Sequence, residues 1–97
     1  MVKVKLQVKN VPVTVLREGK RYVAYSPVFD ISTSAPTHKL VKKRIVEAIE
    51  IFLEEVMRAG TLDKVLRELG WSKRNKAQGW QPPVVVSQEA ERIAVPA

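Results

Sequence analysis

The fold is decided by residues 37–60, THKLVKKRIVEAIEIFLEEVMRAG, the one segment long and periodic enough to predict a helix of about six turns. At about 100° per residue, its apolar side chains fall in one arc that covers about half of the circumference, as in a helix that packs on a core. The members of this arc are Val41, Ile45, Val46, Ala48, Ile49, Phe52, Leu53, Val56 and Met57. Thr37 is a favourable N-cap and Gly60 a favourable C′ residue, so both helix ends are predicted.

The opposite face of this predicted helix is basic at its start. Four basic side chains occupy the first two turns: Lys39, Lys42, Lys43 and Arg44. The helix dipole is positive there, so these charges oppose local stability. Two apolar residues, Leu40 and Ile51, also lie on this charged face. Both features are either accidents of surface composition or parts of a contact surface, and these six residues are therefore the candidate partner-binding site.

Composition predicts one domain, 1–97, without disulfides or a thiolate metal site, because the chain has no cysteine. A single histidine argues against a metalloenzyme, and we expect no metal or cofactor. The net charge of +7, with a pI near 10.0, favours acidic partners, whether nucleic acid, an acidic protein or an anionic membrane surface. Because no secretory pattern and no run of about 18 apolar residues is present, we expect a cytoplasmic protein without a membrane span.

The N-terminal segment alternates apolar residues with lysine, in the period of a half-buried strand. Its apolar members are Val2, Val4, Leu6 and Val8, and its lysines are Lys3, Lys5 and Lys9. The lysine stripe either protects an exposed strand from edge-to-edge aggregation or binds phosphates. Pro12 then interrupts the pairing, so residues 11–16 are either a second strand or a bulged continuation of the first.

A β-hairpin follows, with its turn at residues 17–20. The returning strand, residues 21–26, is rich in aromatic and β-branched residues. Pro27 ends this strand, Phe29 is predicted to anchor the core, and residues 31–35 form a short third strand. A hairpin, a third strand and a long crossing helix predict an α+β layer.

A second, shorter helix is predicted after Gly60. Thr61 is expected to cap it, and Gly70 to end it. Asp63 lies in its first turn, where a negative charge is favourable. Its apolar side chains fall on one side: Leu62, Val65, Leu66 and Leu69.

Residues 71–83 are a predicted basic loop that contains Trp71, Lys73, Arg74, Lys76 and Trp80. Such a loop can stack bases on its aromatic rings, or its tryptophans can pin the loop onto the core. The candidate nucleic-acid-binding site comprises these five residues with Lys3, Lys5 and Lys9. Residues 84–97 are a predicted C-terminal strand segment with two strand-like runs, 84–86 and 92–95, and the second is expected to add an edge strand to the sheet.

From Val11 onward, the order of these pieces resembles the HicB-like antitoxin family. The matching features are Pro12-Val13 at the opening of a strand, the Gly19 turn, Tyr22-Val23-Ala24-Tyr25 before Pro27, a short Ser-rich strand, Thr37 as cap, and the run from Glu47 to Glu55. The resemblance covers about half of the chain. It implies a partial ribonuclease-H-like layer in an oligomer, and the role of an antitoxin that masks an RNA-cleaving HicA-like toxin by protein contact. A stand-alone member with a different partner is the open alternative.

Catalysis by such a layer would need several converging carboxylates to hold two metal ions. The aspartates are Asp30 and Asp63, and neither lies on a predicted core strand. The single imidazole, His38, lies in the first turn of the long helix. No serine occupies a nucleophile-elbow motif, and no Gly-rich phosphate loop is present. We therefore expect a protein without enzymatic activity.

The complete chain thus predicts an α+β domain of order β-β-β-α-α-β, in which a three- to four-stranded, mainly antiparallel sheet packs against one long helix. We expect a homo-oligomer, because one sheet face and the pair Leu40 and Ile51 stay poorly buried. The favoured function is binding and neutralisation of a HicA-like toxin. The alternative is a small basic protein that binds nucleic acid through the lysine-rich strand face and the Trp/Lys/Arg loop.

Overall fold

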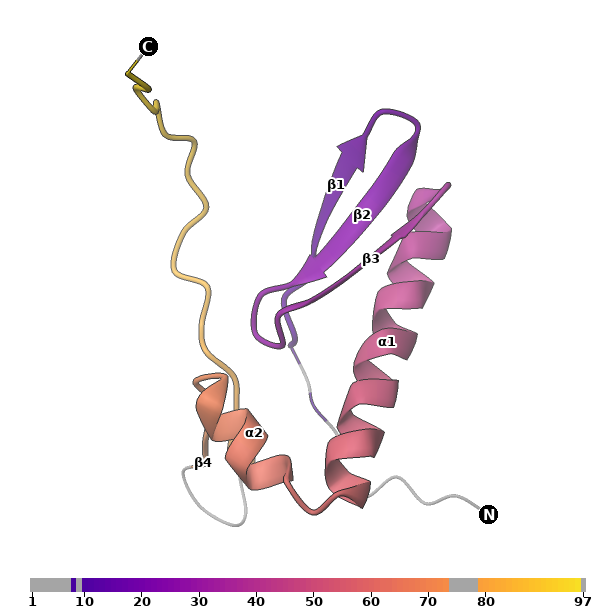
Figure 1. Ribbon diagram of the computed structural model, residues 1–97, viewed down its shortest axis with the longest axis vertical. Helices are drawn as coiled ribbons and strands as arrows, with labels where there is room; N and C mark the ends of the chain where they lie inside the picture. The colour runs from indigo at the N-terminus through magenta and orange to yellow at the C-terminus, as the bar shows by residue number, and fades with distance from the viewer. Residues whose placement is uncertain (1–7, 9, 74–78, 97) are drawn as a thin grey trace.

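The computed structural model describes residues 8, 10–73 and 79–96 and confirms the α+β class (Figure 1). Its elements are β1 (Thr14–Glu18), β2 (Arg21–Ser26), β3 (Ile31–Ala35), α1 (His38–Arg58), α2 (Leu62–Glu68), β4 (Ser72–Lys73) and β5 (Trp80–Gln81). The first three strands form an antiparallel sheet that α1 crosses on one face. Within the described ranges, no helix is long and apolar enough to cross a membrane.

The sheet has the order β1-β2-β3, and its register decides which side chains face α1. Val15, Ala24 and Thr33 lie opposite one another across the three strands. Ala24 is buried and Val15 packs against the core, so this row faces the helix. The next row carries Leu16, Val23 and Ser34, and Leu16 is 53% exposed while the other two are half-buried, so the other face of the sheet is only partly covered.

Both predicted ends of α1 are confirmed by their hydrogen bonds. The Thr37 Oγ1 accepts a hydrogen bond from the Leu40 backbone N–H at 3.1 Å, as an N-cap does. At the other end Gly60 has a φ of 74°, and the Thr61 N–H donates to the Val56 carbonyl at 2.9 Å. This is a Schellman motif, in which a left-handed residue after the helix reverses the chain.

The buried stripe of α1 is narrower than its apolar pattern predicts. Val41, Ile45 and Ile49 are buried at successive turns, but Val46 and Met57, predicted to face the core, are 54% and 39% exposed. A sheet of three strands covers only the centre of the apolar arc, and the flanks remain in water. Leu40, predicted on the solvent side, is instead half-buried against the core.

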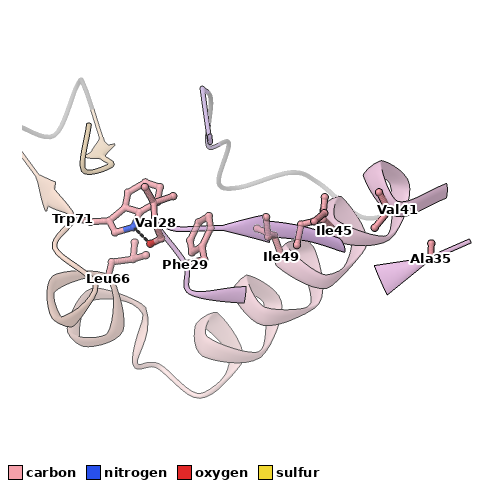
Figure 2. Close-up of a cluster of buried hydrophobic side chains, with 9 residues drawn as sticks. Val28, Phe29, Ala35, Val41, Ile45, Ile49, Leu66 and Trp71 are labelled. Atoms are coloured by element: carbon pink, nitrogen blue, oxygen red, sulfur yellow. Dashed lines mark hydrogen bonds between the residues drawn. The ribbon is translucent and has the colours of Figure 1, made fainter. Parts of the chain in front are cut away.

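An aromatic cluster closes the core at the end far from the start of α1 (Figure 2). The ring of Phe29 lies 4.9 Å from that of Trp71 and 6.0 Å from that of Phe52, centroid to centroid. The Trp71 Nε1–H donates to the Val28 carbonyl at 2.8 Å, and this bond is buried. Phe29 therefore anchors the core, as predicted. Its contact with Trp71 and the Trp71–Val28 hydrogen bond connect the turn between β2 and β3 to the segment that follows α2.

The chain reversal at the end of α2 places Trp71 in this cluster. Gly70 has a φ of 89°, and the Trp71 N–H donates to the Leu66 carbonyl at 2.9 Å, a second Schellman motif. Leu66 and Trp71 are both buried, as the apolar contact of that motif requires. Thr61 is the N-cap residue of α2, as predicted, but its side chain makes no capping hydrogen bond, because the Thr61 hydroxyl donates back to the Val56 carbonyl at 3.4 Å.

The segment after Trp71 differs from the predicted loop and edge strand. β4 and β5 pair with each other as a short hairpin, and residues 82–96 lie in no helix or strand. Among the described residues the main sheet therefore has three strands. Pro82 and Pro83 explain the departure, because proline donates no ladder hydrogen bond and carries the chain away from the hairpin in an extended form. At the other end β1 begins only at Thr14, and the strand predicted over residues 2–8 lies largely outside the described residues.

Ser26 offers a test of the packing between the sheet and α1. Its side chain is 0% exposed, and its hydroxyl finds no hydrogen-bond partner among the described residues. Because an unpaired buried hydroxyl is destabilising, we expect Ser26→Ala to raise the free energy of unfolding by about 1 kcal/mol in a denaturant titration. Ser32→Ala, at an exposed position of β3, should leave it unchanged. A loss of stability in Ser26→Ala would show that the hydroxyl has a partner.

Candidate functional site

The β1–β2 turn and the start of α1 lie at the same end of the molecule (Figure 1). The strand register explains why these two segments are close. Arg17, beside the turn, and Ala35, just before α1, both lie opposite Tyr22 on the central strand. The Tyr22 ring also contacts the His38 ring edge-on, with centroids 6.0 Å apart. The hairpin therefore contacts the first turn of the long helix through Tyr22.

This end of the molecule gathers basic side chains from two elements. The hairpin supplies Arg17, Lys20 and Arg21, and α1 supplies Lys39, Lys42, Lys43 and Arg44. All seven are exposed, and we call them the basic pole. Their own segments, residues 17–21 and 38–47, contain only two acidic residues, Glu18 and Glu47. Because basic residues outnumber acidic ones in these segments, we expect the pole to attract acidic partners.

Ser34 on β3 positions two of the arginines. The Arg21 Nη2 donates to the Ser34 hydroxyl at 3.2 Å, and the Arg44 Nη1 donates to the Ser34 carbonyl at 2.9 Å. Each guanidinium carries five N–H donors, so most of its donors stay available for an anionic group. Arg44 also occupies part of the outer edge of β3. These hydrogen bonds preorganise the Arg21 and Arg44 side chains of the pole in the absence of a partner.

The lysines of the pole are not neutralised by the ion pair seen in the described part of the chain. That pair joins Arg58 to Glu54 at 2.8 Å, near the far end of α1. The first turn of α1 carries no acidic residue, and its dipole adds to the positive potential of Lys39 and its neighbours. The predicted conflict between these charges and the helix dipole is therefore present in the structure.

The structure separates the two apolar members of the predicted partner site. Leu40 packs partly against the core and offers little surface to a partner. Ile51 is 57% exposed, but it lies about two turns beyond Arg44 along α1. It therefore stands apart from the basic pole.

The predicted nucleic-acid site is only partly brought together. Trp71 is 3% exposed and bonded to the core, so its ring is not available to stack on bases. Trp80 is half-buried, with the Arg67 guanidinium 5.3 Å and the Lys73 ammonium 5.6 Å from its ring centroid. Both are cation–π contacts. The contact of Arg67 joins α2 to the β4–β5 hairpin, and the contact of Lys73 lies within that hairpin. The other predicted members lie outside the described residues: Lys3, Lys5, Lys9, Arg74 and Lys76.

The two aspartates have separate structural surroundings. Asp30 ends the turn between β2 and β3 with a φ of 55°, a left-handed conformation that aspartate tolerates. Its carboxylate accepts a hydrogen bond from the Tyr25 hydroxyl at 3.1 Å, and this bond raises the pKa of Tyr25. Asp63 lies on α2. The described residues hold no group of three or more His, Cys, Asp and Glu side chains that could bind a metal ion.

Sequence reasoning identified the helical half of the pole and missed the hairpin half. Arg17 and Lys20 were assigned only to a turn, and Arg21 only to the returning strand, since nothing local shows that the turn lies beside the helix start. The signal that could have placed them is the pairing of the strands on either side of the turn. Comparison with known protein families, curated proteins and solved structures found no match to this chain.

Proposed function

We propose that this protein is a HicB-like binding protein without catalytic activity, which acts by contact of the basic pole with a partner macromolecule. The observation that carries the proposal is that seven exposed basic residues lie on two elements, the β1–β2 hairpin and the start of α1, that meet at one end of the molecule (Figure 1). Specific contact surfaces are complementary in charge, so the partner should present acidic groups to the pole. We place this activity in the cytoplasm.

The first candidate partner is a HicA-like RNA-cleaving toxin. The resemblance of the sequence to the HicB-like family implies this partner, and the proposal uses the three strands, the Thr37 cap and the long helix on which that resemblance rests. In this proposal an acidic patch of the toxin docks on the pole, and the bound protein blocks access of RNA to the toxin. The role requires protein contact alone.

Nucleic acid is the second candidate, favoured by the exposed lysines at the start of α1. Phosphates would take the place of acidic side chains. Affinity for duplex DNA falls with salt in proportion to the number of phosphates contacted, with a slope of about 0.9 per contact. A surface that uses these lysines should therefore show steep salt dependence.

A pull-down from native lysate, with and without nuclease, separates the two candidates. For the first, we expect a small protein that stays bound after nuclease treatment, cleaves RNA when purified alone and stops cleaving when this chain is added back. Recovery of nucleic acid alone would favour the second candidate. If the captured protein cleaves RNA equally well with and without this chain, the antitoxin role is wrong.

Replacement of Lys39, Lys42 and Lys43 by Gln should weaken binding of the captured partner without loss of thermal stability. The melting temperature should stay equal or rise, because charges that oppose the helix dipole are removed. If the partner is duplex DNA, the slope of log affinity against log salt should flatten by about 3. The measurement is a fluorescence titration at several salt concentrations.

The matched control removes three exposed positive charges elsewhere, at Arg58, Lys64 and Arg92. Both variants carry the same net charge, so a general loss of positive potential affects them equally. The proposal expects weaker binding from the pole variant than from the control. Equal affinities would mean that the basic pole is only a solvated surface.

A further inference from the structure

The C-terminal arm, residues 84–96, is extended and exposes large apolar side chains. Val84 and Val86 are 83% and 92% exposed, and Ile93 and Val95 are 77% and 80% exposed. Single exposed apolar residues are ordinary, but four β-branched ones in one short segment favour a strand that lacks a partner. The arm is in no helix or strand of this chain.

One contact shows where the arm passes its own sheet. The Gln88 Nε2 donates to the Thr14 Oγ1 at 3.2 Å, at the beginning of β1. Beyond this point the arm continues on the side of β1, and its end lies away from the helices and strands (Figure 1). The chain's own sheet therefore receives a side-chain contact from the arm but no strand pairing.

The edge of β1 can accept an added strand. Within the described residues β1 pairs only with β2, whereas the other edge of the sheet is partly occupied by the Arg44 contact with Ser34. An unpaired edge presents backbone N–H and C=O groups to which an extended segment can add. Leu16 on β1 is 53% exposed and would supply apolar contact beside that edge.

Charge favours a second copy of this chain as the source of the strand. The arm carries Glu89 and Glu91 with one basic residue, Arg92, so it is acidic within a chain of net charge +7. The hairpin at the end of β1 carries Arg17, Lys20 and Arg21. Opposite charges on the arm and the hairpin would offset the repulsion between two basic molecules.

We propose that the C-terminal arm of one copy adds as a strand to the β1 edge of a second copy, and that the second copy returns the same contact. Two identical contacts make a closed, two-fold dimer. The two strand-forming runs of the arm then gain the ladder partner that they lack in a single chain. The inference goes beyond the proposed function, because it assigns the surface of self-association and does not depend on which partner binds the basic pole.

Two variants test the arm and its receiving edge in the full-length chain. The double change Ile93→Asp and Val95→Asp alters the arm, and Leu16→Asp alters the edge. Light scattering after size-exclusion chromatography should show a dimer for the wild type at micromolar concentration and a monomer for each variant. Ile51→Asp is the control, since it places the same charge on an equally exposed residue of α1, and it should stay dimeric.

Mixing the two defective proteins distinguishes exchange between copies from folding back within one copy. A mixed pair retains one intact contact, the arm of the Leu16→Asp copy on the edge of the other. An equal mixture should therefore recover dimers that neither protein forms alone, with circular dichroism melts showing that each variant is folded. A monomeric wild type, dissociation by Ile51→Asp alone, or no recovery on mixing would overturn the proposal.

Discussion

Trp71→Ala should lower the free energy of unfolding by about 3–5 kcal/mol, the range for removal of a large buried aromatic side chain. The indole is 3% exposed and packs on Phe29 at the junction of the β2–β3 turn with α2. Its removal would leave a cavity there and also leave the Val28 carbonyl without its buried donor. A chemical denaturation curve of each variant gives the measurement.

Two further substitutions separate the packing of Trp71 from its hydrogen bond. Trp71→Phe keeps an aromatic ring and removes the donor to the Val28 carbonyl, so it should lose about 1–3 kcal/mol. Trp80→Ala, at the half-buried tryptophan of the β4–β5 hairpin, should lose less than Trp71→Ala. If Trp80→Ala were the more damaging change, the assignment of Trp71 as the core tryptophan would be wrong.

Ile45→Ala should have the second largest effect, a loss of about 2–5 kcal/mol. Ile45 is 1% exposed at the centre of the buried stripe of α1, whereas Phe52, another member of the predicted apolar arc, is only half-buried. Its neighbour Val46 is 54% exposed and provides the control. Val46→Ala should change stability by no more than about 0.5 kcal/mol. Similar losses at both positions would mean that the buried face of α1 has been assigned wrongly.

Local chemistry explains why the long helix and the hairpin could be predicted. Thr37 supplies a side-chain acceptor, Gly60 adopts a positive φ, and Gly19 with a φ of 59° permits a two-residue turn. Each of these signals acts within a few residues of its own position. The same applies to Gly70, whose conformation sets the direction of the chain at Trp71.

The remaining features depend on contacts between distant segments. The exposure of Val46 follows from the width of the sheet, and the pairing of β4 with β5 joins residues that are seven or more positions apart in the sequence. The strand propensity of residues 92–95 is real, but propensity cannot supply a partner strand. For this reason the edge strand was predicted and is absent from the single chain.

The candidate site likewise has one part that local sequence signals predict and one part that depends on contacts between distant segments. Lys39 and its neighbours on α1 were found from the helix pattern, because their conflict with the dipole is local. The hairpin residues of the pole could be identified only from the strand register, which places Arg17 opposite Tyr22, and from the contact of Tyr22 with His38. A basic surface built from two elements can be recognised only when the positions of both elements are known.

The central claim is that the hairpin and the start of α1 form one binding surface, and a hairpin variant tests it most directly. Arg17 and Lys20 are changed together to Gln, and the affinity of the partner captured in the pull-down is compared with that of an Arg58→Gln and Lys64→Gln control. Two lost charge contacts should weaken binding by about tenfold relative to the control. An unchanged affinity would show that the hairpin takes no part in binding and would contradict the account.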